Sequence, residues 1–217
     1  MTGLLLKDLL NLRKYFCTLA LLLAVYAAIF IPTAGTISFS AVIVLLTSMV
    51  ATTTFSYDDM AHWPPYALTL PITRRDLVRS KYALLFLLSA GGAVLSLLIC
   101  LAAGYFMPDK GLPWSETLGA HALLLAIALF FGSVMLPLLF RFGAERARLL
   151  MILCYAAPTV LIFTGVSLVR ERFPDFVASV NWDRVIEQFI WIAPVAILLL
   201  LWLSYRLSVR ICQRKEY

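Results

Sequence analysis

The chain has 217 residues, of which 62% are hydrophobic and 14% are charged, and its mean hydropathy is +0.92. A soluble domain averages roughly 45–50% apolar and about 25% charged residues, so this composition excludes a soluble globular protein. Sparse charge excludes a disordered chain, and four cysteines exclude a disulfide scaffold. We therefore expect an all-α, polytopic membrane protein whose residues 1–217 form one transmembrane domain.

Residues 1–15 predict an amphipathic helix lying in the membrane interface. Leu5, Leu9, Leu12 and Phe16 recur at helical spacing and form one apolar face. The opposite side carries Lys7, Asn11 and Lys14. The alternative is that this stretch simply lengthens the first span.

Six long apolar segments, nearly free of charged residues, predict six transmembrane helices. Each approaches or exceeds the roughly 20 residues that cross a bilayer as a helix. They cover residues 16–32, 37–55, 82–106, 118–140, 149–169 and 189–207. The connection 33–36 is so short that the first two helices are expected to form an antiparallel hairpin.

The basic residues predict the orientation of this bundle. Of the 18 Lys and Arg residues, 14 fall on the side that holds both termini and 4 on the other side. Since cytoplasmic loops are enriched in Lys and Arg, we expect both termini in the cytoplasm. The net charge of +6 is then explained by contacts with anionic lipid, and no nucleic-acid partner is expected.

The motifs of the common membrane enzymes are absent from the sequence. No lysine follows a Gly-rich turn and precedes Ser or Thr, so a phosphate-binding loop is missing. His62 and His121 stand outside any His-Glu-x-x-His motif, and Ser133 lacks the spacing of a serine nucleophile. The four cysteines are scattered. We expect no catalytic residue, metal or cofactor site in this chain.

A row of hydroxyl groups follows one face of the second span. Ser48, Thr52 and Ser56 recur every four residues. This stripe either packs against a neighbouring helix or lines a dimer seam or a substrate path.

Residues 56–81 form the most strongly patterned cytoplasmic connection. Asp58 and Asp59 end the second span, and Pro64, Pro65 and Pro71 are expected to interrupt the backbone. Thr73 followed by Asp76 is an acidic variant of the capping box and predicts the start of a helix running through Lys81. The four basic residues of this helix are expected near the membrane surface or facing acidic partners: Arg74, Arg75, Arg79 and Lys81.

Aromatic and aliphatic residues stand among the charges of this connection and predict a protein contact surface; a plain basic loop is the alternative. They are Trp63, Tyr66, Leu68, Leu70 and Ile72. The pattern Asp59, Trp63, Tyr66, Leu70-Pro71, Arg74, Val78 and Lys81-Tyr82 resembles the small permeases of type 2 ABC exporters, a group that includes phenol-soluble modulin and lantibiotic exporters.

The resemblance implies a transporter made of two permeases, as two copies of this chain or one copy with a paralogue, and two separate ATPases that bind ATP and Mg. It also implies that residues 58–75 couple to the ATPase, with residues 4–15 as a second contact. The coupling residues would be Asp58, Asp59, Trp63, Tyr66, Leu70, Pro71, Arg74, Arg75 and Lys81.

Two functions agree with these observations. The first is a permease that exports hydrophobic or amphipathic molecules, including antimicrobial and other peptides. The alternative is a non-transporting immunity or scaffold protein that sequesters a peptide in the membrane.

Overall fold

The computed structural model describes residues 2–106, 113–172 and 182–215. Within these ranges the chain is helical and contains no strand. The helices are α1 (Thr2–Ala34), α2 (Thr36–Met60), α3 (Trp63–Ala67), α4 (Arg74–Phe106), α5 (Trp114–Arg172) and α7 (Trp182–Arg214). The predicted all-α fold is therefore confirmed.

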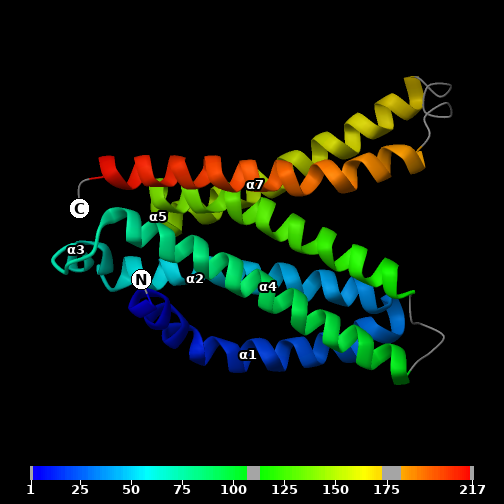
Figure 1. Ribbon diagram of the computed structural model, residues 1–217, viewed down its shortest axis with the longest axis horizontal. Helices are drawn as coiled ribbons and strands as arrows, with labels where there is room; N and C mark the ends of the chain where they lie inside the picture. The colour runs from blue at the N-terminus through cyan, green and yellow to red at the C-terminus, as the bar shows by residue number, and fades with distance from the viewer. Residues whose placement is uncertain (1, 107–112, 173–181, 216–217) are drawn as a thin grey trace.

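The long helices run side by side, and α3 and both described chain ends lie at the same end of the bundle (Figure 1). We call this the terminal end. The main core is built by side chains from the five long helices, including Leu12, Ile43, Leu84, Leu136 and Cys212. Helices α2 and α4 lie at the centre of the bundle in Figure 1.

Five helical segments are long and apolar enough to cross a membrane, as judged by length and composition over the described residues. They are Tyr15–Ala34, Thr36–Met60, Arg74–Tyr105, Trp114–Arg146 and Pro194–Arg214. The expected span 149–169 falls in the second half of α5, where most side chains lie outside the described part of the chain. A sixth span therefore stays a prediction.

A tight turn joins α1 to α2, as the short connection 33–36 predicts. Gly35 alone separates the two helices and has φ 83° and ψ 168°. A side chain is strained at this positive φ, so glycine allows the chain to reverse here. The predicted antiparallel hairpin is confirmed.

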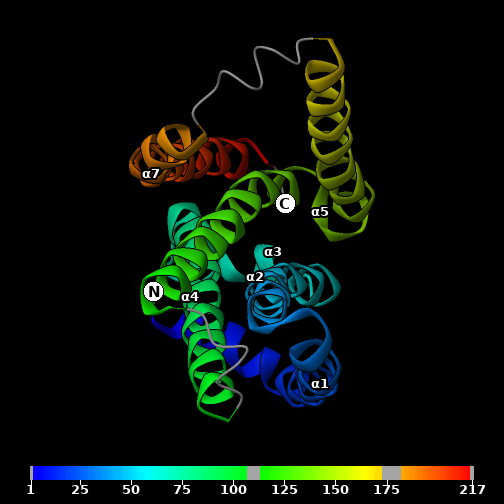
Figure 2. The ribbon, with the colours of Figure 1, turned by 90° about the vertical axis from the view of Figure 1, so that its right-hand side faces the viewer.

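Helix α5 consists of two helical halves joined at Gly143. This residue has φ 75° and ψ 175°, which no helix contains. The two halves separate at this point, and the second half turns away from the first (Figure 2). Gly143 thus forms the turn between the predicted fourth and fifth spans.

The first fifteen residues do not form a separate helix, because α1 continues from Thr2 to Ala34. Its first turns are inclined to the remainder (Figure 1). The predicted apolar face is present in part, since Leu12 is fully buried and Leu5 and Leu9 pack against the core. An interfacial position of this stretch stays a prediction.

Candidate functional site

Four ionised side chains from three helices form a compact cluster at the terminal end of the bundle. Lys7 Nζ lies 2.5 Å from Asp58 Oδ1, and Lys81 Nζ lies 2.6 Å from Asp58 Oδ2. Asp8 completes the cluster, with Oδ1 3.1 Å from Lys7 Nζ and Oδ2 3.0 Å from Lys81 Nζ. The cluster therefore balances two positive and two negative charges.

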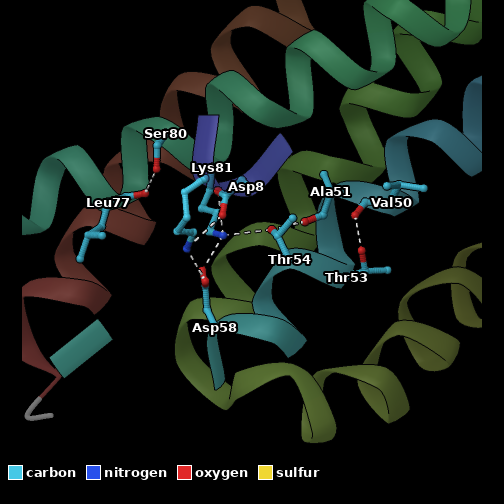
Figure 3. Close-up of polar contacts among 10 residues, drawn as sticks. Asp8, Val50, Ala51, Thr53, Thr54, Asp58, Leu77, Ser80 and Lys81 are labelled. Carbon is cyan, nitrogen blue, oxygen red and sulfur yellow. Dashed lines mark hydrogen bonds and ion pairs between the residues drawn. The ribbon is translucent and has the colours of Figure 1, made fainter. Parts of the chain in front are cut away.

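The cluster is nearly excluded from solvent. Side-chain exposure is 2% for Asp8, 8% for Lys81, 9% for Asp58 and 23% for Lys7. Lys81 Nζ also donates a hydrogen bond of 3.0 Å to Thr54 Oγ1. Figure 3 shows Asp8, Asp58 and Thr54 converging on the Lys81 ammonium from α1 and α2. A buried charge that loses its partners is costly, so the cluster ties the ends of α1, α2 and α4 together.

This arrangement corrects two expectations from the sequence. Lys7 was expected on the outer side of an interfacial helix, and Lys81 near the membrane surface or facing acidic partners. Both ammonium groups instead turn inward, because each lies next to two carboxylates that are themselves buried. Lys81 also falls within a segment apolar enough to span a membrane, directly before the predicted span 82–106.

Helix α3 lies next to the cluster and has two prolines directly after its first residue. Pro64 and Pro65 were expected to interrupt the backbone, but they occupy the first turn of α3. The first amides of a helix have no intrahelical acceptor, so a missing N–H costs little there. His62 precedes the helix with φ 46° and ψ 39°, the left-handed conformation that turns the chain from α2 into α3.

The inner face of α3 packs against α1 and α4. Ala67 is fully buried and forms a small core with Leu4 and Leu77, against which Trp63 packs. The Lys7 ammonium lies 4.3 Å from the centre of the Trp63 ring, a cation–π contact. Trp63 of α3 therefore directly contacts a member of the ion cluster.

Asp59 connects the end of α2 to the second half of α5. Its Oδ2 accepts a hydrogen bond of 2.7 Å from the backbone N–H of Ala144. Ala144 directly follows the Gly143 break, so Asp59 caps the helix that begins there. The adjacent residues Asp58 and Asp59 thus bind different helices.

Arg74 connects the start of α4 to the end of α7. Its guanidinium donates hydrogen bonds to the carbonyl oxygens of Cys212 at 2.6 Å and Lys215 at 2.5 Å. Terminal helix carbonyls lack intrahelical donors and carry partial negative charge, so an arginine there is favourable. Arg74 was expected at the membrane surface or facing acidic partners, yet it contacts backbone carbonyls within the bundle.

The predicted capping box at the start of α4 is confirmed. Thr73 N–H donates to Asp76 Oδ2 at 3.1 Å, and Asp76 N–H donates to Thr73 Oγ1 at 3.2 Å. The reciprocal bonds place Arg74 in the first turn of α4, from which it reaches α7. All six helices of the described chain contribute side chains to one small pocket at the cluster, with a cavity volume of about 50 Å³.

The segment 58–75 thus has an inner and an outer set of side chains. Asp58, Trp63 and Arg74 contact other helices, as described above. The outer set is exposed, with Met60, Tyr66 and Leu70 at 80%, 59% and 40%. Pro71 and Arg75 are exposed as well. Their coupling role stays a prediction.

The hydroxyl stripe of α2 bonds within its own helix. Ser48 Oγ donates to the carbonyl of Leu45 at 2.8 Å, and Thr52 Oγ1 donates to the carbonyl of Met49 at 2.7 Å. Ser48 is buried, while Thr52 and Ser56 are half-buried. These contacts leave both interpretations of the stripe open.

The sequence of the chain matches a known protein family. A family model described as ABC-2 family transporter protein matches residues 3–213. The chain belongs to the ABC-2 transporter family. No curated protein and no solved structure matches it.

Membership of this family defines the general role of the chain. The family is the membrane permease component of ABC transporters, which agrees with a chain that is not itself the ATPase. It implies an ABC ATPase as partner and a multi-pass membrane location. The end of the bundle with the ion cluster and α3 is the candidate site for contact with that partner.

Proposed function

We propose that this chain is the permease subunit of an ATP-driven type 2 exporter in a bacterial plasma membrane. It moves hydrophobic or amphipathic substrates outward, including antimicrobial and other peptides. Two permeases, as two copies or as one copy with a paralogue, pair with two ATPase subunits. The chain resembles the phenol-soluble modulin and lantibiotic exporter permeases in its 59–82 segment, and this resemblance supports the choice of substrate.

The observation that carries the proposal is the two-sided construction of residues 58–75. The outer side chains Met60, Tyr66 and Leu70 are exposed apolar groups on a segment that also exposes Arg75. Exposed aromatic and aliphatic groups rimmed by charge are typical of protein contact sites. The terminal end faces the cytoplasm in this proposal, because the basic residues concentrate there.

The inner side chains give a route by which the partner moves the spans. Asp58 contacts α1 and α4, Asp59 contacts α5, and Arg74 contacts α7. When the ATPases close on ATP, they displace α3, and the helices tied to its flanks shift as rigid bodies. The shift produces alternating access or lateral release of the substrate. Exposed Leu6 and Leu10 of α1 provide the second contact.

The test is reconstitution of the chain with its cognate ABC ATPase in lipid vesicles. We expect stable association and stimulated ATP hydrolysis. The double variant Tyr66→Ala/Leu70→Ala should weaken association at least about tenfold, since exposed aromatic anchors carry much of an interface's affinity. The matched control is Trp114→Ala/Leu118→Ala, an exposed aromatic–leucine pair with the same spacing at the opposite end of the bundle.

The outcomes separate the proposed function from its alternative. No association and no stimulation by the unchanged chain would contradict a permease role. Equal weakening by both double variants would contradict α3 as the contact. The sequestration alternative predicts that cells stay protected from a toxic peptide when the ATPase is made unable to hydrolyse ATP, whereas an exporter loses that protection.

A further inference from the structure

A groove between α5 and α7 opens at the terminal end of the bundle. Its cavity volume is about 480 Å³. One part of its wall is apolar and consists of Pro137, Leu138, Leu207 and Ile211. Leu207 is 50% exposed, so this wall is accessible from outside the bundle.

The remaining lining residues of the groove are cations. They are Arg141, Arg214 and Lys215, and no acidic residue stands among the described residues that line the groove. Arg141 and Arg214 are exposed. Lys215 Nζ donates to the carbonyl oxygen of Phe140 at 3.2 Å, which holds its ammonium at the α5 side of the groove.

The carbonyl oxygens at the end of α7 carry partial negative charge and weaken this positive potential only slightly. Those of Cys212 and Lys215 already accept hydrogen bonds from Arg74. Their partial negative charge is therefore balanced from the far side by a guanidinium. The groove presents three cations to a ligand without a nearby carboxylate among the described lining residues.

The cations and the apolar wall follow one another in the same order as the headgroups and the hydrocarbon of a membrane leaflet. Arg141 directly follows the apolar run of α5, and Arg214 ends the candidate span of α7. A membrane boundary drawn at these residues would put the cations at the level of the lipid phosphates and the apolar wall toward the hydrocarbon. Arginine binds phosphate oxygens through two parallel N–H donors, and basic pockets between membrane helices bind anionic headgroups.

We propose that this groove is a binding site for an anionic phospholipid of the surrounding leaflet. Arg141, Arg214 and Lys215 hold the headgroup phosphate, and an acyl chain lies along Leu138, Leu207 and Ile211. A zwitterionic lipid brings its own cation to the three already present, so the site selects a lipid with net negative charge. A soluble anion leaves the apolar wall unused. The proposal does not depend on the exported substrate or on the partner ATPase.

The test compares lipids bound by the purified full chain in nanodiscs of equal parts phosphatidylglycerol and phosphatidylcholine. Native mass spectrometry counts the retained lipids, and thermal unfolding reports the stabilisation that each lipid gives. We expect preferential retention of phosphatidylglycerol. Arg141→Gln/Arg214→Gln should reduce this retention at least about tenfold, because each surface cation contributes substantially to anionic lipid binding. The control Arg13→Gln/Arg79→Gln removes the same charge from exposed positions outside the groove.

A third variant tests the apolar wall. Leu207→Ser should lower phosphatidylglycerol retention while stabilisation by glycerol phosphate stays unchanged. Equal retention of both lipids by the unchanged chain would overturn the proposal, as would an equal loss in the control variant. Stabilisation by inorganic phosphate that matches phosphatidylglycerol would instead assign the site to a soluble anion.

Discussion

Thr47 of α2 occupies the space beside the backbone of Gly92 in α4 that a side chain at position 92 would need. A Cβ at residue 92 would lie 1.9 Å from Thr47 Oγ1. Thr47 is fixed in place, since its hydroxyl donates to the carbonyl of Ile43 at 2.8 Å. Small residues let membrane helices approach closely, and here the approach joins the two central helices of the bundle.

Gly92→Ala should therefore lower the free energy of unfolding by about 1–3 kcal/mol, the usual cost of overpacking. Its neighbour provides the control, because a Cβ at Gly91 meets nothing within 4 Å. Gly91→Ala should be neutral or slightly stabilising through helix propensity. Unfolding of the purified chain in a detergent titration measures both values. Equal effects of the two variants would disprove the close contact.

Asp58→Asn should destabilise the chain by about 3–5 kcal/mol, because it leaves excess positive charge in a buried cluster. Adding Lys81→Met restores the charge balance of the cluster, since Lys7 and Asp8 remain as an ion pair at 3.1 Å. The double variant should thus be more stable than the sum of the single effects by at least about 1 kcal/mol. Glu171→Gln, an exposed change of the same type, is the control and should be nearly neutral. Additive effects would show that Asp58 and Lys81 do not interact.

Local signals in the sequence predicted local structure well. The capping pair Thr73 and Asp76 marks the start of α4, and the connection 33–36 marks the reversal at Gly35. Both features depend on residues within four positions of each other, so no knowledge of the rest of the fold is needed. The membrane class follows from the composition, which also requires no knowledge of the fold.

The sequence analysis did not predict that the charged residues of the cluster point into the bundle. Each of α1, α2 and α4 nevertheless carries a pattern that indicates it. Asp8 lies on the same buried face of α1 as Leu4, Leu12, Leu19 and Leu23. A charge near a helix end reaches either the headgroups or the neighbouring helices, and only the packing of α1, α2 and α4 decides between them. A periodicity search that kept charged residues on the apolar face would have marked Asp8, Asp58 and Lys81 as candidates.

Thr73→Ala should loosen the first turn of α4 without unfolding the bundle. It removes the hydroxyl that accepts from Asp76 N–H and donates to Asp76 Oδ2 at 2.6 Å. Asp76 N–H keeps its hydrogen bond to the Thr73 carbonyl oxygen at 2.9 Å, so we expect only about twofold faster hydrogen exchange of this amide. Thr73→Ser keeps the hydroxyl and should exchange like the unchanged chain. Similar exchange rates for the Ala and Ser variants would contradict the capping role.

Gly143→Ala tests the turn that separates the two halves of α5. At φ 75° and ψ 175° only glycine is free of strain, so the substitution should cost about 1–3 kcal/mol of stability. The new Cβ would also lie 3.2 Å from Asp59 Oδ2, the oxygen that caps Ala144. Gly143→Asn should be no better, because asparagine tolerates the left-handed helical region and ψ 175° lies outside it. The control Gly165→Ala has open space around its Cβ and should be neutral or slightly stabilising. Unfolding titrations in detergent compare the three variants, and recovery by Asn but not by Ala would mean that residue 143 adopts an ordinary left-handed turn.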